Sequence, residues 1–305
     1  MLLVLASRIL SETKGKGIMA TALSGTRIEQ LRQTVWKTLK TAGIHAHPPE
    51  GKFWQPFIVQ EKNRRQRFLA AIQSGGRAIA TFIDHTLLKP EVGKSRITQL
   101  CQEAQTHGFA AVCINPVYVS FVAFQLQNAR SRVCSVVGFP LGATTPAVKA
   151  QETRQAIADG AKEIDMVLHV GALKDRDLVA VYRDIQAVVS ICDDHEVLCK
   201  VILETAFLAD EEKVLACELA ALAGAAYVKT STGFGPGGAT EQDVALMEHV
   251  VAPYRMGVKA SGGIRTWQQA VNMIQAGAIR IGASASVSII TEATTGNGNA
   301  TTSYT

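Results

Sequence analysis

The sequence predicts an α/β protein, a (β/α)8 barrel of the TIM type with an N-terminal extension and a flexible C-terminal tail. From about residue 80, short apolar runs rich in β-branched residues recur eight times, about 28 residues apart on average. Stretches with helical periodicity lie between them, which is typical of parallel strands joined by crossover helices. Five or six strands would favour a doubly wound open sheet, and no Gly-x-Gly-x-x-Gly motif follows the first run.

The expected elements of the barrel follow in order along residues 76–290. Strands are predicted at residues 80–84, 110–114, 133–139, 164–170, 198–203, 226–230, 257–260 and 279–282. Helical spacing is clearest over residues 148–158, 178–191, 211–222 and 267–276. Helix starts are expected at the caps Asp210 and Thr266, and helix ends at Gly108, Gly160, Gly224 and Gly277.

Residues 1–75 do not fit this repeat and form the expected extension, partly helical or disordered. Helical spacing over residues 28–39 is broken by His45-Ala46-His47-Pro48-Pro49. Residues 1–20 are apolar and then rich in Ser, Thr and Lys; an organelle-targeting segment is one interpretation, and a disordered arm is the favoured one. The two histidines lack a third metal ligand nearby, so a plain loop pair is favoured. Residues 291–305, rich in Thr, Gly and Asn, are the expected flexible tail.

Composition narrows the class of protein. Of 305 residues, 47% are hydrophobic and 19% charged, enough for one large domain or two small ones. No apolar run approaches the ~18 residues of a membrane span, so no membrane partner is expected. The six cysteines are scattered without a Cys-x-x-Cys pair, which predicts free thiols in a reducing compartment, the cytoplasm.

The net charge of +5 is unevenly distributed. Residues 1–80 hold 13 Lys and Arg against 4 Glu, whereas the remainder is net negative. The basic cluster at residues 62–67 could suggest nucleic acid, but no aromatic interleaving or nucleic-acid motif accompanies it. A solvated helix face is the favoured interpretation, and no nucleic-acid partner is expected.

Two lysines, Lys229 and Lys259, each lie inside an apolar run that ends in small residues and glycine. Burying a lysine costs free energy unless the amine is paired or loses its proton. Two such amines, about one βα unit apart, would oppose each other's charge and lower an amine pKa. A neutral buried amine is what Schiff-base chemistry on a carbonyl substrate requires.

Further polar residues stand at or near expected strand ends, where TIM barrels carry their chemistry. These are Asp84, Thr86, Cys113, Asp165, Lys200 and Glu204. Asp165 needs a partner among its apolar neighbours, either Lys200 in a structural ion pair or a lysine in a proton relay. Cys113 is expected to pack in the core, and Glu204 is either an acid/base group or a strand-end cap.

The last two expected strands end in Ser261-Gly262-Gly263 and Gly282-Ala283-Ser284. Glycine allows backbone N–H groups to approach an anion closely. Loops after strands seven and eight are the usual phosphate site of TIM barrels. We therefore expect a phosphate site here, with ordinary tight turns as the alternative.

Six segments resemble the deoxyribose-phosphate aldolase family, in its order and spacing. They are residues 82–88 (FIDHTLL), 137–142 (VGFPLG), 163–167 (EIDMV), 201–205 (VILET), 228–233 (VKTSTG) and 258–265 (VKASGGIR). The resemblance covers roughly residues 78–290. It implies a class I aldolase with a (β/α)8 fold that uses neither a metal nor another cofactor.

The resemblance also implies roles for single residues. Lys229 corresponds to the Schiff-base lysine, Lys259 to a second lysine that depresses its pKa, and Asp165 to the carboxylate of a proton relay. The implied substrate contacts are Asp84, Thr86, Cys113, Thr230, Gly233, Gly262, Gly263, Gly282 and Ser284. Tyr304 resembles a C-terminal tyrosine that reaches the site in some members, although it is penultimate here. Ala285 replaces a second serine found after Ser284 in some members.

The implied reaction is reversible Schiff-base cleavage of 2-deoxy-D-ribose 5-phosphate to D-glyceraldehyde 3-phosphate and acetaldehyde, in deoxyribonucleoside catabolism. Two alternatives remain open: another Schiff-base sugar-phosphate enzyme, such as a transaldolase-like barrel, or a non-catalytic sugar-phosphate-binding barrel. The expected partners are the small sugar phosphate and a second copy of the chain in a homodimer.

Overall fold

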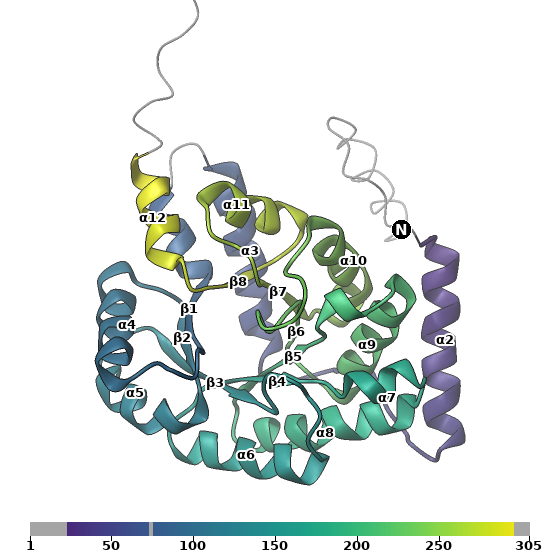
Figure 1. The fold of residues 1–305 in the computed structure, drawn as a ribbon. Coiled ribbons are helices and arrows are strands. Elements are labelled where there is room, and N and C mark those ends of the chain that lie inside the picture. The colour runs from purple at the N-terminus through teal and green to yellow at the C-terminus, as the bar shows by residue number, and fades with distance from the viewer. Residues whose placement is uncertain (1–22, 73–75, 296–305) are drawn as a thin grey trace, which may run out of the picture.

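The structure, a computed structural model, describes residues 23–72 and 76–295 (Figure 1). Eight parallel strands close into a barrel in the order β1 to β8, which confirms the predicted TIM fold. The strands are β1 (Ile83–Leu87), β2 (Ala111–Ile114), β3 (Arg132–Val137), β4 (Glu163–Val167), β5 (Leu198–Ile202), β6 (Tyr227–Lys229), β7 (Gly257–Ser261) and β8 (Arg280–Ala283). Tyr304 and residues 1–20 lie outside the described residues.

Helices surround the strands and form the outer layer of the barrel (Figure 1). They are α4 (Lys94–His107), α5 (Val119–Gln125), α6 (Pro146–Ala158), α7 (Val170–Lys174), α8 (Leu178–Asp194), α9 (Asp210–Ala223), α10 (Glu241–Val251), α11 (Trp267–Ala276) and α12 (Ser286–Thr295). Short 3-10 turns occupy Gly76–Phe82, Pro116–Tyr118, Thr205–Phe207 and Ala252–Tyr254. None of the helices in the described ranges combines the length and apolar character needed to cross a membrane.

Several expected boundaries need correction, among them that of the fourth strand, which ends at Val167 and not at residue 170. The first strand begins at Ile83 and not at residue 80, because the preceding residues form a 3-10 turn that packs Gly76 against α12. Helix α9 has Ala209 as its N-cap, so Asp210 is the first helical residue and its charge favours the helix dipole. The expected tail boundary at residue 291 falls inside α12, where Thr291 Oγ1 bonds the carbonyl of Val287 at 2.9 Å.

Alternating side chains along β4 to β8 separate an apolar outer layer from a charged barrel interior, whereas β2 and β3 contribute Ala111, Cys113, Cys134 and Val136 to a separate buried cluster. In β4, Ile164 and Met166 belong to the apolar core, whereas Glu163 and Asp165 take part in buried ion pairs. The same alternation in β5 to β8 places lysines and an arginine next to these carboxylates. The strand register therefore gathers charges from distant parts of the sequence in one place.

The extension contributes two helices, α2 (Gly25–Thr41) and α3 (Gln55–Ala70). Helix α2 packs on α8 and α9, where Arg32 Nε donates to Glu218 Oε1 at 2.9 Å. In α3, the Phe57 ring lies under the guanidinium groups of Arg132 and Arg280, which begin β3 and β8. Helix α3 thus covers the N-terminal ends of strands, the face opposite the expected chemistry.

The basic cluster of α3 at residues 62–67 is not simply the solvated face expected from the sequence. Lys62 Nζ lies 3.1 Å from Glu248 Oε1 of α10. Arg65 Nε donates to the carbonyl of Ile274 at 2.6 Å, near the C-terminal end of α11. Cations are favourable at such helix ends. These side chains therefore attach α3 to the barrel.

Candidate active site

Asp165 lies at the centre of the charged interior and holds three lysines. Its Oδ2 accepts hydrogen bonds from Lys229 Nζ and Lys259 Nζ, both at 2.7 Å. Its Oδ1 accepts from Lys200 Nζ at 2.6 Å. Register explains the cluster, because Asp165 pairs with Lys200 across β4 and β5, and Lys229 with Lys259 across β6 and β7. Both partners considered for Asp165 are thus present at once.

Two further carboxylates complete the cluster. Asp84 accepts from Lys259 and from Arg280 Nη1, the latter at 2.8 Å. Glu163 lies 2.7 Å from Lys200 Nζ and 3.3 Å from Arg280 Nη1. When all groups are ionised, the three carboxylates and the four bases leave one excess positive charge. The cluster can hold these buried charges because each charged group lies within hydrogen-bond distance of at least one group of opposite charge.

Mutual pairing shifts the pKa values of Asp165 and Lys259 in opposite directions. Burial alone would raise the pKa of Asp165, but Lys200, Lys229 and Lys259 outweigh it and hold that pKa well below its usual range. Burial alone would lower the pKa of Lys259, but Asp165 and Asp84 raise it above its usual value. The expectation that the two lysines lower each other's pKa is therefore wrong for Lys259.

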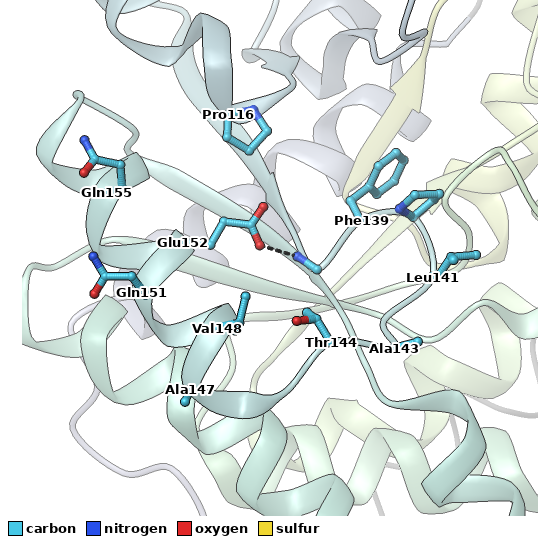
Figure 2. A pocket seen from close by; sticks show the side chains of 12 residues that line it. Pro116, Phe139, Leu141, Ala143, Thr144, Ala147, Val148, Gln151, Glu152 and Gln155 are labelled. Carbon is cyan, nitrogen blue, oxygen red and sulfur yellow. Dashed lines mark hydrogen bonds between the residues drawn. The ribbon is translucent and has the colours of Figure 1, made fainter.

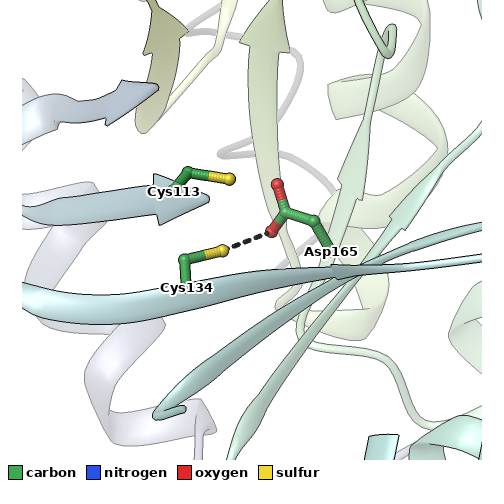
Figure 3. Close-up of side chains that lie close together, drawn as sticks. All are labelled: Cys113, Cys134 and Asp165. Atoms are coloured by element: carbon green, nitrogen blue, oxygen red, sulfur yellow. Dashed lines mark hydrogen bonds between the residues drawn. The ribbon is translucent and has the colours of Figure 1, made fainter. Parts of the chain in front are cut away.

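Two thiols border Asp165 on the side of β2 and β3 (Figure 3). Cys134 Sγ donates to Asp165 Oδ1 at 3.2 Å and accepts from Lys200 Nζ at 3.3 Å. The contact with Cys134 lowers the pKa of the Cys113 thiol, whereas burial raises the pKa of Cys134. Both thiols are fully buried, as expected for Cys113.

A cavity of about 310 Å³ opens at the C-terminal ends of the strands, above this cluster. Lys229 lines it with a side chain 3% exposed, and is the residue that joins the cavity to Asp165. The other lining residues are Thr86, Leu87, Leu88, Lys89, Thr232, Gly233, Phe234, Ser261, Gly262, Gly263, Ile264, Arg265, Gly282, Ala283 and Ser284. Six of the predicted substrate contacts are among them: Thr86, Gly233, Gly262, Gly263, Gly282 and Ser284.

Three predicted substrate contacts do not line this cavity. Asp84 and Cys113 are fully buried beneath it. Thr230 is also buried; its Oγ1 donates to the carbonyl of Ser261 at 2.9 Å and accepts from the N–H of that residue at 3.0 Å. Thr230 therefore links β6 to β7. In this structure the three residues support groups that meet the cavity.

The cavity wall has features that favour an anion. Gly262 adopts φ +88°, and its carbonyl oxygen accepts from Ala239 N–H at 3.0 Å. A Cβ at Gly238 would lie 2.2 Å from that oxygen, so only glycine allows the loops after β6 and β7 to meet this closely. Ser284 precedes α12, whose N-terminal end favours negative charge. Arg265 adds an exposed cation at the rim.

Glu204 braces the loop after β6. Its Oε2 accepts from the backbone N–H of Thr232 at 3.1 Å and from the Thr232 hydroxyl. Its other carboxylate oxygen is buried and has no hydrogen-bond partner within the described structure. The geometry favours the loop-capping interpretation over an acid/base role, because Glu204 does not line the cavity.

A larger surface hollow of about 890 Å³ lies between the loop after β3 and α6 (Figure 2). Glu152 is the single charged residue among those that line it. Its Oε2 accepts from the backbone N–H of Gly138 at 2.8 Å. Figure 2 draws a dashed line from the Glu152 carboxylate for this hydrogen bond. Because the lining offers no amine and no free acid, we do not place the active site here despite the greater volume.

Sequence reasoning missed several parts of the site. Arg280 and Glu163 were not singled out, although Arg280 stands in an apolar run like those of Lys229 and Lys259, and Glu163 directly precedes the run that holds Asp165. The charge in or next to each run was the available signal. Arg265 and Lys89 follow strand ends and line the cavity, a position that could have identified them as anion contacts.

Comparisons with known proteins agree with this geometry. Residues 78–300 match the family described as DeoC/LacD family aldolase. The chain is 58% identical over 214 residues to deoxyribose-phosphate aldolase 1 of Bacillus licheniformis, which covers 70% of this chain and 95% of the relative. It is 57% identical over 212 residues to the deoxyribose-phosphate aldolase of Listeria monocytogenes, covering 70% and 94%.

Solved structures extend the similarity. A structure assigned to deoxyribose-phosphate aldolase from Coccidioides immitis superposes with a TM-score of 0.71 at 36% identity, covering 90% of this chain and 99% of that one. The tetrameric deoxyribose phosphate aldolase from Aeropyrum pernix gives a TM-score of 0.70 at 33% identity, covering 77% and 98%. With most of its barrel matched by one family, this chain belongs to the DeoC/LacD family of aldolases.

Proposed function

We propose that this protein is a deoxyribose-phosphate aldolase that reversibly cleaves 2-deoxy-D-ribose 5-phosphate to D-glyceraldehyde 3-phosphate and acetaldehyde. One observation carries the proposal: Lys229 both lines the cavity and donates to the buried Asp165. A substrate aldehyde can therefore meet an amine that already has a proton acceptor beside it. The family membership and the named relatives support the same reaction.

In the proposed mechanism, neutral Lys229 attacks the aldehyde carbon to form a carbinolamine. Loss of water gives an iminium ion, which accepts the electron pair of the C2–C3 bond as that bond breaks. Asp165, acting through a water molecule, takes up the proton of the C3 hydroxyl and shuttles protons during dehydration, while the charged Lys259 holds the carboxylate through a hydrogen bond. The resulting enamine is protonated and hydrolysed to acetaldehyde, which regenerates the free amine.

Substrate orientation follows from the cavity wall. We assign the phosphate to Gly233, Gly262, Gly263 and Ser284, with Arg265 and the N-terminal end of α12 as positive partners. Holding the phosphate at one end places the aldehyde at Lys229, and fixed geometry of this kind lowers the activation free energy. Asp84 and Cys113 contribute from beneath by holding Lys259 and bordering Asp165.

Assembly and location are proposed separately. We propose that the chain pairs as a homodimer; the Aeropyrum pernix relative is a tetramer, so higher assembly is the alternative. The six cysteines are buried free thiols, which supports a reducing compartment such as the cytoplasm.

The test is release of acetaldehyde from 2-deoxyribose 5-phosphate, coupled to alcohol dehydrogenase and NADH. The expected result is turnover with this substrate and much slower release of glyceraldehyde 3-phosphate from fructose 6-phosphate, a ketose that a transaldolase-like enzyme would accept; that product is followed separately with triosephosphate isomerase, glycerol-3-phosphate dehydrogenase and NADH. Preference for the ketose would contradict the proposal. Binding of the phosphate sugar without turnover would instead support a non-catalytic barrel.

A further inference from the structure

The pair of thiols beside Asp165 has a geometry that catalysis does not require. Cys113 and Cys134 stand opposite each other in the register of β2 and β3, where neighbouring strands lie about 4.8 Å apart. Asp165 follows on β4. The two sulfur atoms and a carboxylate oxygen all lie within 4.8 Å of one another (Figure 3). No other group of three such ligand atoms comes this close among the residues that the structure describes.

Two sulfurs and one oxygen form a donor set suited to a thiophilic divalent cation. Zinc binds cysteine sulfur at about 2.3 Å and carboxylate oxygen at about 2.1 Å in tetrahedral sites, which places donors roughly 3.5–3.8 Å apart. Cys134 Sγ and Asp165 Oδ1, at 3.2 Å, would have to separate slightly, and the longest separation in the group, up to 4.8 Å, would have to shorten by up to about 1 Å. We propose that Cys113, Cys134 and Asp165 form a binding site for one thiophilic cation, such as Zn²⁺ or Cd²⁺, whose occupation blocks the reaction.

Charge balance makes the site selective. Binding joins the cation to two sulfurs and releases two thiol protons, so two positive charges enter as two leave. The net charge of the surrounding cluster does not change. A hard cation such as Mg²⁺ takes oxygen ligands and would not displace the thiol protons. It would therefore add two charges to a buried cluster that already carries one positive charge in excess.

The cation would replace contacts that Asp165 now makes. Lys200 and Cys134 both bond Oδ1 of Asp165, and Lys200 would keep Glu163, which lies 2.7 Å from its amine. Loss of the ion pair between Lys200 and Asp165 would thus leave the Lys200 ammonium still paired with Glu163. A bound cation would withdraw Asp165 from Lys229, whose side chain lies between the site and the cavity. Access from the cavity past Lys229 gives the cation a path to the thiols.

The chain supplies a matched control pair. Cys192 of α8 and Cys199 of β5 also lie in contact, as the raised pKa of Cys199 in a hydrogen bond with Cys192 shows. Both belong to the apolar core between the strands and the helices. This pair shares the chemistry of two adjacent buried thiols without the carboxylate. It should not bind the cation tightly.

The test is titration of the reduced full-length protein with cadmium chloride in a buffer free of thiols. Cadmium–thiolate bonds absorb in the ultraviolet, and proton release is followed with a weakly buffered pH indicator. We expect one cation bound and two protons released per chain, inhibition of turnover that a chelator reverses, and no competition from Mg²⁺. Cys113→Ala and Cys134→Ala should each weaken binding at least about tenfold, whereas Cys192→Ala should match the unaltered protein.

Unchanged binding in Cys134→Ala, or loss of binding in Cys192→Ala, would overturn the proposal. Circular dichroism checks that each variant folds, and Cys→Ser at the same position replaces a variant that does not. Only the inhibition readout rests on the proposed function. Absorbance and proton release report the site in any case, so inactivity with 2-deoxyribose 5-phosphate and absence of the cation site are distinguishable.

Discussion

Lys149 and Lys229 are both buried and each pairs with an aspartate at 2.7 Å, yet of the two only Lys229 lines the candidate active-site cavity. Lys149 of α6 bonds Asp184 of α8 outside the barrel, and Lys229 bonds Asp165 inside it. Lys149 also donates to the carbonyl of Val167 at 2.8 Å and does not line the candidate active site. Burial outweighs Asp184 and lowers the pKa of Lys149. A lowered pKa and a carboxylate partner therefore do not make a Schiff-base lysine, because the amine must also reach substrate.

The largest expected effect on activity comes from removing the amine of Lys229, the proposed nucleophile. Lys229→Met should lower kcat/KM by more than about 10⁴-fold, since no other amine in the cavity stands beside Asp165. The coupled acetaldehyde assay measures the loss, and circular dichroism confirms folding. Activity within tenfold of the unaltered protein would show that Lys229 is not the nucleophile.

Replacing the aspartate that pairs with Lys229 should give a smaller loss of activity. Asp165→Asn should reduce kcat by about 10²–10³-fold, because an amide neither accepts the proton nor balances the charge of Lys259. The matched change Asp184→Asn should leave kcat within twofold, since Asp184 is distant from the reacting groups. Equal effects of the two substitutions on kcat would remove the distinction between the pairs.

For the pair of Lys149 and Asp184, we expect substitution to change the stability of the fold and not the activity. Lys149→Met leaves Asp184 buried without its cation, and should lower the free energy of unfolding by about 3–5 kcal/mol. Turnover by the folded fraction should stay unchanged. Urea denaturation followed by tryptophan fluorescence measures the first quantity, and the coupled assay at low temperature measures the second. A selective loss of kcat with full stability would contradict a structural role.

Acid titration should also distinguish Asp184 from Asp165. Burial raises the pKa of Asp184, so its protonation stabilises the fold as the pH falls through that raised value. The pKa of Asp165 lies below the unfolded value of about 3.9, so its stabilisation is present above that pH and is lost as the pH falls through the lowered pKa. Carbon-13 NMR of the carboxyl groups should show Asp184 titrating first, and the reverse order would contradict the charge network.

The smallest expected effect concerns the rim of the cavity. Arg265→Gln should raise KM for 2-deoxyribose 5-phosphate about tenfold by removing one phosphate partner, with little change in kcat. Turnover of unphosphorylated 2-deoxyribose should stay the same. An equal loss with both sugars would mean that Arg265 acts on the fold or on the chemistry.

The barrel and its central residues could be predicted because local signals were strong. Lysines in apolar runs marked Lys229 and Lys259, and a lone acid in such a run marked Asp165. The charge state of Lys259 could not be predicted, because Asp84 is 175 residues away in the sequence and meets it only when the barrel closes. The burial of Thr230 beneath the cavity likewise depends on the register of β6 with β7.

In the N-terminal extension, too, the helices could be predicted from the sequence but their contacts could not. Helical spacing over residues 28–39 predicted α2, and α3 begins after the Pro48-Pro49 break. What these helices contact depends on barrel surfaces that are distant in the sequence. The basic side chains of α3 were therefore assigned to solvent, although Lys62 and Arg65 bond the barrel.

The most direct test is borohydride reduction of the protein with 2-deoxyribose 5-phosphate, followed by peptide mass analysis. The expected result is a stable adduct on Lys229 and none on Lys149, since only Lys229 lines the cavity. An adduct on another lysine, or none on folded protein, would contradict the assignment of Lys229 as the Schiff-base residue.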